Sequence, residues 1–166
     1  MILTSHAIAG TIVASLVPNH PVLGFGLGLV SHYLLDMIPH WEAPMHTDAL
    51  TNKEDLGLAS FKNKILWLDF FIKGSDLFIG ISLSALVLYF MSCFNLQVLI
   101  IGASAGVLPD LLQFFYLLWK KFPLNWIQRF HEIFHNNHFE FRKIEGILTQ
   151  VITVFFLIIL AFFIKK

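Results

Sequence analysis

The chain has 166 residues, of which 57% are hydrophobic and only 13% are charged, against roughly a quarter in a soluble domain. With a mean hydropathy of +0.73, this composition indicates an integral membrane protein. The 11 basic and 11 acidic residues balance, so nucleic acid is not an expected partner, and the single cysteine excludes an internal disulfide and a cysteine-based zinc site.

Five apolar segments follow one another along the chain, at about residues 2–17, 22–38, 77–94, 98–119 and 144–164. A short mixed piece, 66–72, precedes the third. The first segment covers about 24 Å as a helix, less than the roughly 30 Å of hydrocarbon, so it either just spans or forms a re-entrant hairpin with the second. We predict an all-α, polytopic membrane helix bundle of four to five transmembrane helices, forming a single integral membrane domain over residues 1–166.

The polar connections indicate the orientation of this bundle. Nine of the eleven Lys and Arg residues lie between the second and third segments or between the fourth and fifth, including the polar loops at about 40–65 and 120–143. The positive-inside rule makes this face cytoplasmic, although Lys165 and Lys166 fall on the other side. We expect a multi-pass protein of a prokaryotic plasma (inner) membrane, with the N-terminus and any active site on the cytoplasmic side.

Histidine and aspartate side chains gather near the cytoplasmic ends of the apolar segments. His32 lies about 10 Å inside Pro39 and Asp110 about 13 Å inside Trp119, by the helical rise. Such short polar side chains are costly at this depth unless they are paired, so each is a candidate functional residue.

The spacing of these residues predicts that they point into the bundle. His32 and Asp36 continue a row of glycines at four-residue intervals, Asp110 continues a second such row, and His6 precedes Gly10 in a third. Small residues at this spacing allow membrane helices to pack closely. We therefore expect His6, His32, Asp36 and Asp110 to converge as metal ligands.

A histidine-rich segment follows the fourth apolar segment. His131, His135 and His138 are spaced to share one face of a helix, and flanking aromatic residues favour an amphipathic helix at the membrane interface. This segment could close over the other four residues and add metal ligands, with the neighbouring Glu132 as the catalytic general base. A pH-sensitive or headgroup-contacting surface is the alternative interpretation of these histidines.

Three short stretches, "TSHAIAG", "SHYLLDMIPHW" and "GVLPDLL", carry a resemblance to a known family. The chain resembles the bacterial and archaeal membrane-bound metal-dependent hydrolases, which are often likened to zinc-dependent phospholipase C. The resemblance implies that His6, His32, Asp36 and Asp110 bind the metal. The chain departs from the family pattern at Leu112, where a second acid is common, and in "HEIFHNNH", where the family commonly has H-R-G-x-T-H-S.

We expect an enzyme, a metal-dependent hydrolase that uses a metal-activated water to attack a phosphoester or ester bond. Mixed imidazole and carboxylate ligands suit Zn most closely, with Mn or Fe also compatible. The expected partners are the lipid bilayer and a phospholipid substrate. An ion or proton transporter and a non-catalytic structural membrane protein are the alternatives; the face opposite the histidines offers few polar residues, which argues against transport.

Overall fold

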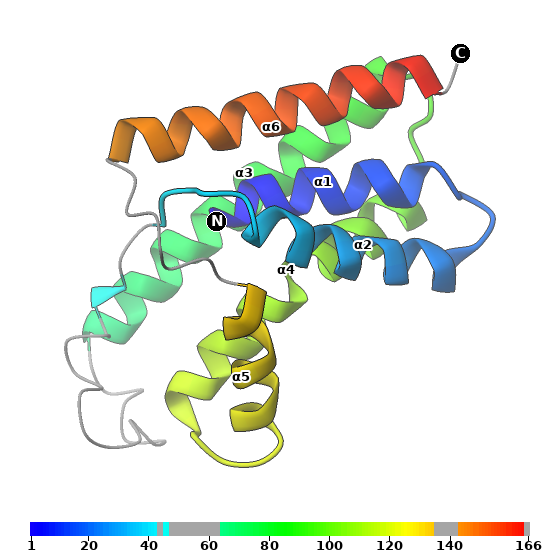
Figure 1. Cartoon of the computed structure of the whole chain (residues 1–166). Helices are drawn as coiled ribbons and strands as arrows, with labels where there is room; N and C mark the ends of the chain where they lie inside the picture. The colour runs from blue at the N-terminus through cyan, green and yellow to red at the C-terminus, as the bar shows by residue number, and fades with distance from the viewer. Residues whose placement is uncertain (43–44, 47–63, 135–142, 165–166) are drawn as a thin grey trace.

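The computed structural model describes residues 1–42, 45–46, 64–134 and 143–164, and within these ranges it is helical with no β-strand. The helices, in chain order, are α1 (Leu3–Ser15), α2 (Pro21–Asp36), α3 (Lys64–Phe90), α4 (Leu96–Leu118), α5 (Leu124–Phe134) and α6 (Lys143–Ile164) (Figure 1). The all-α prediction is confirmed for the described residues.

Three of these helices, α3, α4 and α6, are long and apolar enough to cross a membrane, with 27, 23 and 22 residues. The prediction of four to five such helices is wrong for the described residues. With 13 and 16 residues, α1 and α2 extend only about 20 and 24 Å, because a proline-containing turn separates them and α2 ends at Asp36.

Large apolar side chains cover the outside of the long helices. Phe71 and Phe78 on α3 and Phe155 and Phe156 on α6 are all exposed. Water tolerates few contiguous apolar surfaces of this kind, whereas hydrocarbon accepts them. This distribution is what a lipid-facing surface requires.

The third predicted segment is longer than expected and starts earlier. The mixed piece at 66–72 and the apolar run after it form one helix, α3, through Gly74 and Ser75. Neither residue removes a backbone N–H as proline would, so the helical hydrogen bonds can continue. The following helix begins at an N-cap: the side chain of Asn95 accepts hydrogen bonds from the N–H groups of Gln97 (2.9 Å) and Val98 (3.2 Å).

The short helix α1 is the centre of the bundle. Eleven of its 13 residues are buried, and it contacts α2, α3, α4 and α6. Figure 1 shows α1 between α6 on one side and α2 on the other. A helix that is buried all round is expected to be apolar or to carry polar groups with a specific partner, and α1 carries the buried His6.

Glycines bring α1 and α4 into backbone contact. A Cβ atom added to Gly102 would lie 2.5 Å from Cα of Thr11, and one added to Gly10 or Gly106 would also collide with the backbone of the facing helix. The small-residue rows seen in the sequence therefore do pack against another helix. This close approach brings the start of α1 beside the part of α4 that contains Asp110.

A carboxylate from α3 binds the first turn of α1. The side chain of Asp76 accepts hydrogen bonds from the backbone N–H of Leu3 (2.7 Å) and of Thr4 (3.3 Å), and from the Thr4 hydroxyl. These N–H groups have no partner within α1, so the carboxylate satisfies them and complements the positive end of the helix dipole. Asp76 thus fixes α1 two residues before His6.

Candidate metal centre

Four side chains from three helices meet inside the bundle. They are His6 on α1, His32 and Asp36 on α2, and Asp110 on α4, and one potential ligand atom of each lies within 4.8 Å of all the others. His32 and Asp36 reach the same point because residues four apart lie on one face of a helix. The other two arrive through the contacts of α1 with α2 and α4.

Asp36 lies between the two imidazoles. Its Oδ1 is 3.2 Å from Nε2 of His6, and its Oδ2 is 3.0 Å from Nε2 of His32. Asp110 faces the same two nitrogens, each at 3.7 Å. The two imidazole rings stack with their centroids 4.0 Å apart.

His131 from α5 joins this group. Its Nε2 lies 3.6 Å from Oδ2 of Asp36 and 3.9 Å from Oδ1 of Asp110, and its side chain is buried. Of the three histidines predicted on this segment, His135 and His138 lie outside the described residues. We use "the His/Asp cluster" for His6, His32, Asp36, Asp110 and His131.

Glu132, the predicted catalytic base, lies on a different face of α5 from His131. Glu132 is exposed, and its carboxylate accepts a hydrogen bond from Nε2 of Gln128 at 3.1 Å. Adjacent residues on a helix point about 100° apart, so the burial of His131 in the cluster directs Glu132 elsewhere. Its role as a base stays a prediction.

The backbone of α4 orients His32. Nδ1 of His32 lies 2.7 Å from the carbonyl oxygen of Gly106. A carbonyl oxygen only accepts, so Nδ1 carries the proton in this contact and Nε2 of the neutral ring keeps its lone pair. That lone pair faces the two carboxylates, and a carbonyl partner of this kind is typical of a metal-binding histidine.

Tyr33 connects α5 to this site. Its ring centroid lies 5.3 Å from those of both His32 and Phe130, and 4.8 Å from that of Phe134. Aromatic contacts in this distance range stabilise packing beyond simple burial. They hold α5 against α2, which places His131 over the other four side chains.

The polar atoms of the cluster are unusual for a protein interior. Among the described residues, both ring nitrogens of His6, Nε2 of His32, and one carboxylate oxygen each of Asp36 and Asp110 are buried without a hydrogen bond. Buried polar atoms normally have a partner. The two carboxylates also bring negative charge into an apolar surrounding, where the amino group of Met1, 3.5 Å from Oδ1 of Asp36, is one positive group beside them.

The distances test whether a metal would fit. Ligand atoms bound tetrahedrally at 2.0–2.1 Å from Zn²⁺ lie about 3.3 Å from one another. The closest nitrogen–oxygen distances in the cluster run from 3.0 to 3.9 Å, and the ligand atoms of His6, His32, Asp36 and Asp110 lie within 4.8 Å of one another, so these four would have to move inward to share one cation. Nitrogen and oxygen donors of this kind suit Zn²⁺, Mn²⁺ and Fe²⁺. The residues fit a divalent metal.

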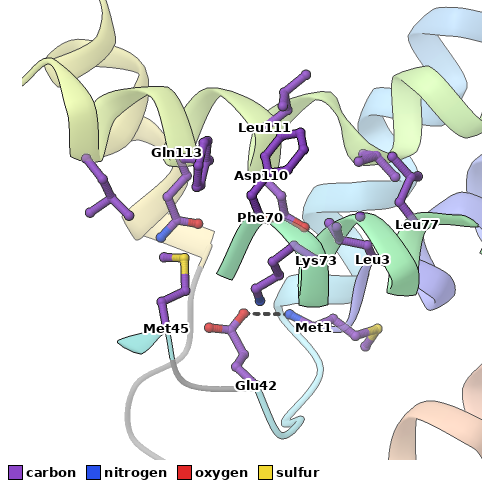
Figure 2. A pocket seen from close by; sticks show the side chains of 14 residues that line it. Met1, Leu3, Glu42, Met45, Phe70, Lys73, Leu77, Asp110, Leu111 and Gln113 are labelled. Atoms are coloured by element: carbon purple, nitrogen blue, oxygen red, sulfur yellow. Dashed lines mark hydrogen bonds and ion pairs between the residues drawn. The ribbon is translucent and has the colours of Figure 1, made fainter. Parts of the chain in front are cut away.

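A polar group next to the cluster was not anticipated from the sequence. The amino group of Met1 lies 3.5 Å from Oδ1 of Asp36, 2.6 Å from Nε2 of His40 and 2.6 Å from Oε1 of Glu42. Figure 2 shows the contact between Met1 and Glu42. No local pattern indicates such contacts, because they join residues almost forty positions apart.

No protein-family model, curated protein or solved structure matches the chain. The chemistry of the cluster and its position in the bundle are the observations that bear on function.

Proposed function

We propose that this chain is a membrane-embedded metal-dependent hydrolase, with the metal held by the His/Asp cluster. The observation that carries the proposal is the convergence of buried imidazole and carboxylate groups on His6, His32, Asp36 and Asp110, among which both ring nitrogens of His6, Nε2 of His32 and one oxygen of each carboxylate have no hydrogen bond. The resemblance to the membrane-bound metal-dependent hydrolases, through the stretches that contain His6, His32, Asp36 and Asp110, supports the same assignment. Zinc is the first expectation, with manganese or iron as alternatives.

A bound divalent cation supplies Lewis acidity toward a phosphoryl or acyl oxygen and makes water a stronger nucleophile at neutral pH. The side chains have separate tasks around it. His6 and Asp36 are fully enclosed and hold the cation, while the Gly106 carbonyl keeps Nε2 of His32 available as a donor. Asp110 is the partly exposed member, so it is the ligand closest to an incoming substrate.

Two carboxylates are candidates for the base that takes a proton from the attacking water. Asp110 lies at the accessible side of the cluster, and its Oδ2 is without a hydrogen bond in the described part of the chain. Glu132, the base expected from the sequence, is next to His131 along α5 but accepts a hydrogen bond from Gln128. The position of Asp110 favours it over Glu132.

The substrate we propose is a phosphoester or ester at the level of the lipid headgroups, first of all a phospholipid. A site formed by α1, α2 and α4 and covered by α5 would meet such a bond at the interface. By the positive-inside rule, the basic residues at the start of α3, after the end of α4 and at the start of α6 support a cytoplasmic position for this side of the proposed enzyme. The membrane that we propose is the plasma membrane. The N-terminus would share that side.

The direct test is metal content of the protein purified in detergent without chelators or a His-tag. We expect stoichiometric zinc, manganese or iron by mass spectrometry in the unmodified protein, and its loss in Asp36→Ala and Asp110→Ala. Glu145→Ala, which removes an exposed carboxylate of α6, is the matched control and should keep the metal. Helical circular dichroism and a single gel-filtration peak establish that the variants remain folded.

Absence of metal from the unmodified protein, even after zinc is added, would overturn the proposed centre and favour a structural role. If metal is present, hydrolysis of phosphoester and carboxylic ester lipids is measured next. Glu132→Gln and Asp110→Asn are compared for the base, the latter only if metal analysis shows that it keeps the metal. Ion uptake into sealed vesicles that contain the protein, without hydrolysis, would support the transporter alternative instead.

A further inference from the structure

A pocket of about 390 Å³ lies between α3 and α4, with the start of α1 beside it. Its volume is within the range of about 300–1,000 Å³ that small-molecule sites occupy. The apolar part of its lining includes Leu3, Phe70, Leu77, Val107, Leu111 and Phe114. Figure 2 shows Asp110 and Lys73 extending into the same space, close to Leu3 and Leu77.

The pocket reaches the His/Asp cluster at one residue. The side chain of Asp110 is 15% exposed, whereas the other four cluster side chains are at most 1% exposed. Asp110 also lines the pocket. Within the described part of the chain, the pocket is therefore the side from which a molecule can approach the cluster.

The pocket opens toward the lipid-facing surface. Phe70 and Leu111, which line it, are 55% and 45% exposed on helices long and apolar enough to cross a membrane. A second pocket on the outside of α3 shares Phe70 and Gly74 with the first, so apolar surface continues outward from it. An apolar chain could enter sideways from the bilayer, whereas a polar solute would have to cross this surface.

The charged groups of the pocket indicate which end of a molecule would lie near the cluster. Lys73 supplies a positive charge one turn before Leu77 on α3, and a divalent cation held beside Asp110 would add another. The acid Glu42, which contacts the amino group of Met1, lines the same pocket. Lysine ammonium groups and divalent cations are common partners of phosphate oxygens.

We propose that this pocket binds an anionic lipid phosphate that enters from the bilayer, with its phosphate between Lys73 and Asp110. One acyl chain lies along Leu77, Val107 and Leu111. This inference rests on the proposed function, because the phosphate approaches the same metal centre, and it specifies the substrate class and the route of entry. Lys73 selects for a phosphate over a neutral headgroup.

The probe is dodecyl phosphate carrying a diazirine on its alkyl chain, added to the protein in phosphatidylcholine nanodiscs and cross-linked by light. Peptide mass spectrometry is expected to find adducts concentrated in residues 70–77 and 107–117. Adducts spread evenly over the lipid-facing surfaces of α3, α4 and α6 would overturn the proposal, since bulk-lipid contact alone would explain them.

Filling the pocket provides a paired test. Leu77→Trp should lower the yield of these adducts by about tenfold, which is the result of a tenfold weaker affinity for the probe. Leu83→Trp is the control, because Leu83 is exposed on the same helix but does not line the pocket. Leu111→Trp repeats the test from α4 in case Leu77→Trp does not fold. Equal labelling of all three variants and the unmodified protein would contradict the pocket assignment.

The headgroup is tested through Lys73. Lys73→Met should weaken labelling by the alkyl phosphate by about tenfold, without changing labelling by the corresponding dodecyl maltoside probe. Lys64→Met, at the exposed start of α3, is the matched control. If dodecyl phosphate and dodecyl maltoside label the pocket equally in the unmodified protein, phosphate recognition is wrong. Complete competition by inorganic phosphate alone would argue against the acyl chain.

Metal content separates this proposal from the proposed function. If the protein contains its metal but the pocket is not preferentially labelled, the metal centre is supported and the lipid proposal is wrong. If the protein contains no metal but is still labelled at residues 70–77 and 107–117, and Lys73→Met weakens this labelling, the lipid phosphate site is supported and the proposed hydrolase is wrong. The two failures therefore give different results.

Discussion

His32 uses its two ring nitrogens for two different contacts. Nδ1 donates to the carbonyl oxygen of Gly106, and Nε2 faces Asp36 at 3.0 Å. The first contact fixes the tautomer and the ring angle, which leaves the second nitrogen as a donor toward a metal. Spacing in the sequence predicts which face of α2 His32 occupies, but the tautomer depends on a carbonyl 74 residues away.

Asp76 stabilises the start of α1 through its carboxylate. It accepts hydrogen bonds from Leu3 and Thr4 at the start of α1, so it acts as an N-terminal cap supplied by another helix. A cap from a residue more than seventy positions away leaves no local signal in the sequence.

We predict that Asp76→Ala lowers the free energy of unfolding in detergent by about 1–2 kcal/mol, since it removes the acceptor of the first-turn N–H groups. Thermal unfolding followed by circular dichroism measures the change. Ser82→Ala, which removes a hydroxyl bonded to its own helix at Phe78, is the control on α3 and should change stability by less than about 0.5 kcal/mol. Equal effects of the two substitutions would argue against the capping role.

Among the elements, the contact between α1 and α4 decides the geometry of the site. The backbones approach so closely at Gly10, Gly102 and Gly106 that no side chain fits between them. This approach brings His6 and Asp110 within reach of each other, and neither helix contains both groups. Small-residue rows in the sequence predicted close packing, but not which helix faces which, because Gly24 and Gly28 on α2 form a similar row.

We predict opposite effects for two glycine-to-alanine substitutions. Gly102→Ala should destabilise the protein by about 1–3 kcal/mol and reduce metal content, because the added methyl group forces α1 and α4 apart. Gly26→Ala, where an added Cβ would have no neighbour within 4 Å, should leave metal content unchanged and raise stability by about 0.5–1 kcal/mol. Thermal unfolding and metal analysis of both variants test this; a tolerated Gly102→Ala would contradict the assigned contact.

Across the whole molecule, the described polar site lies toward one end of the bundle. The cluster, Asp76 and Lys73 lie near the start of α1, the end of α2 and the first half of α3. His20 lies at the opposite end of the α1–α2 hairpin. A one-sided arrangement suits a site that serves one face of a membrane, as the proposed function requires.

The proposed cytoplasmic orientation predicts a specific labelling pattern in intact cells. With Cys93→Ser as the background, a cysteine placed at Gln97, exposed at the start of α4, should react with a membrane-impermeant maleimide from outside, while one placed at Lys121 should react only after permeabilisation. The basic connections between helices are the physical reason, since they are retained on the cytoplasmic side during insertion. The reverse pattern would show that the metal site faces the other side of the membrane.

Composition and spacing along the chain were enough to predict the helical class, the membrane character and the candidate residues His6, His32, Asp36 and Asp110, which the structure brings together. These features depend on composition and on four-residue spacing, and both are local. The prediction from sequence overestimated the number of helices long enough to span a membrane, because apolar residues continue past the ends of α1 and α2.

How the helices and the candidate residues combine depends on the packing between helices. The capping of α1 by Asp76, the contact of His32 with Gly106, the burial of His131 and the pocket at Asp110 all join residues from different helices. Such contacts depend on how close two backbones can approach and which groups then remain without a partner. Those quantities are properties of the packed bundle, and no single segment contains them.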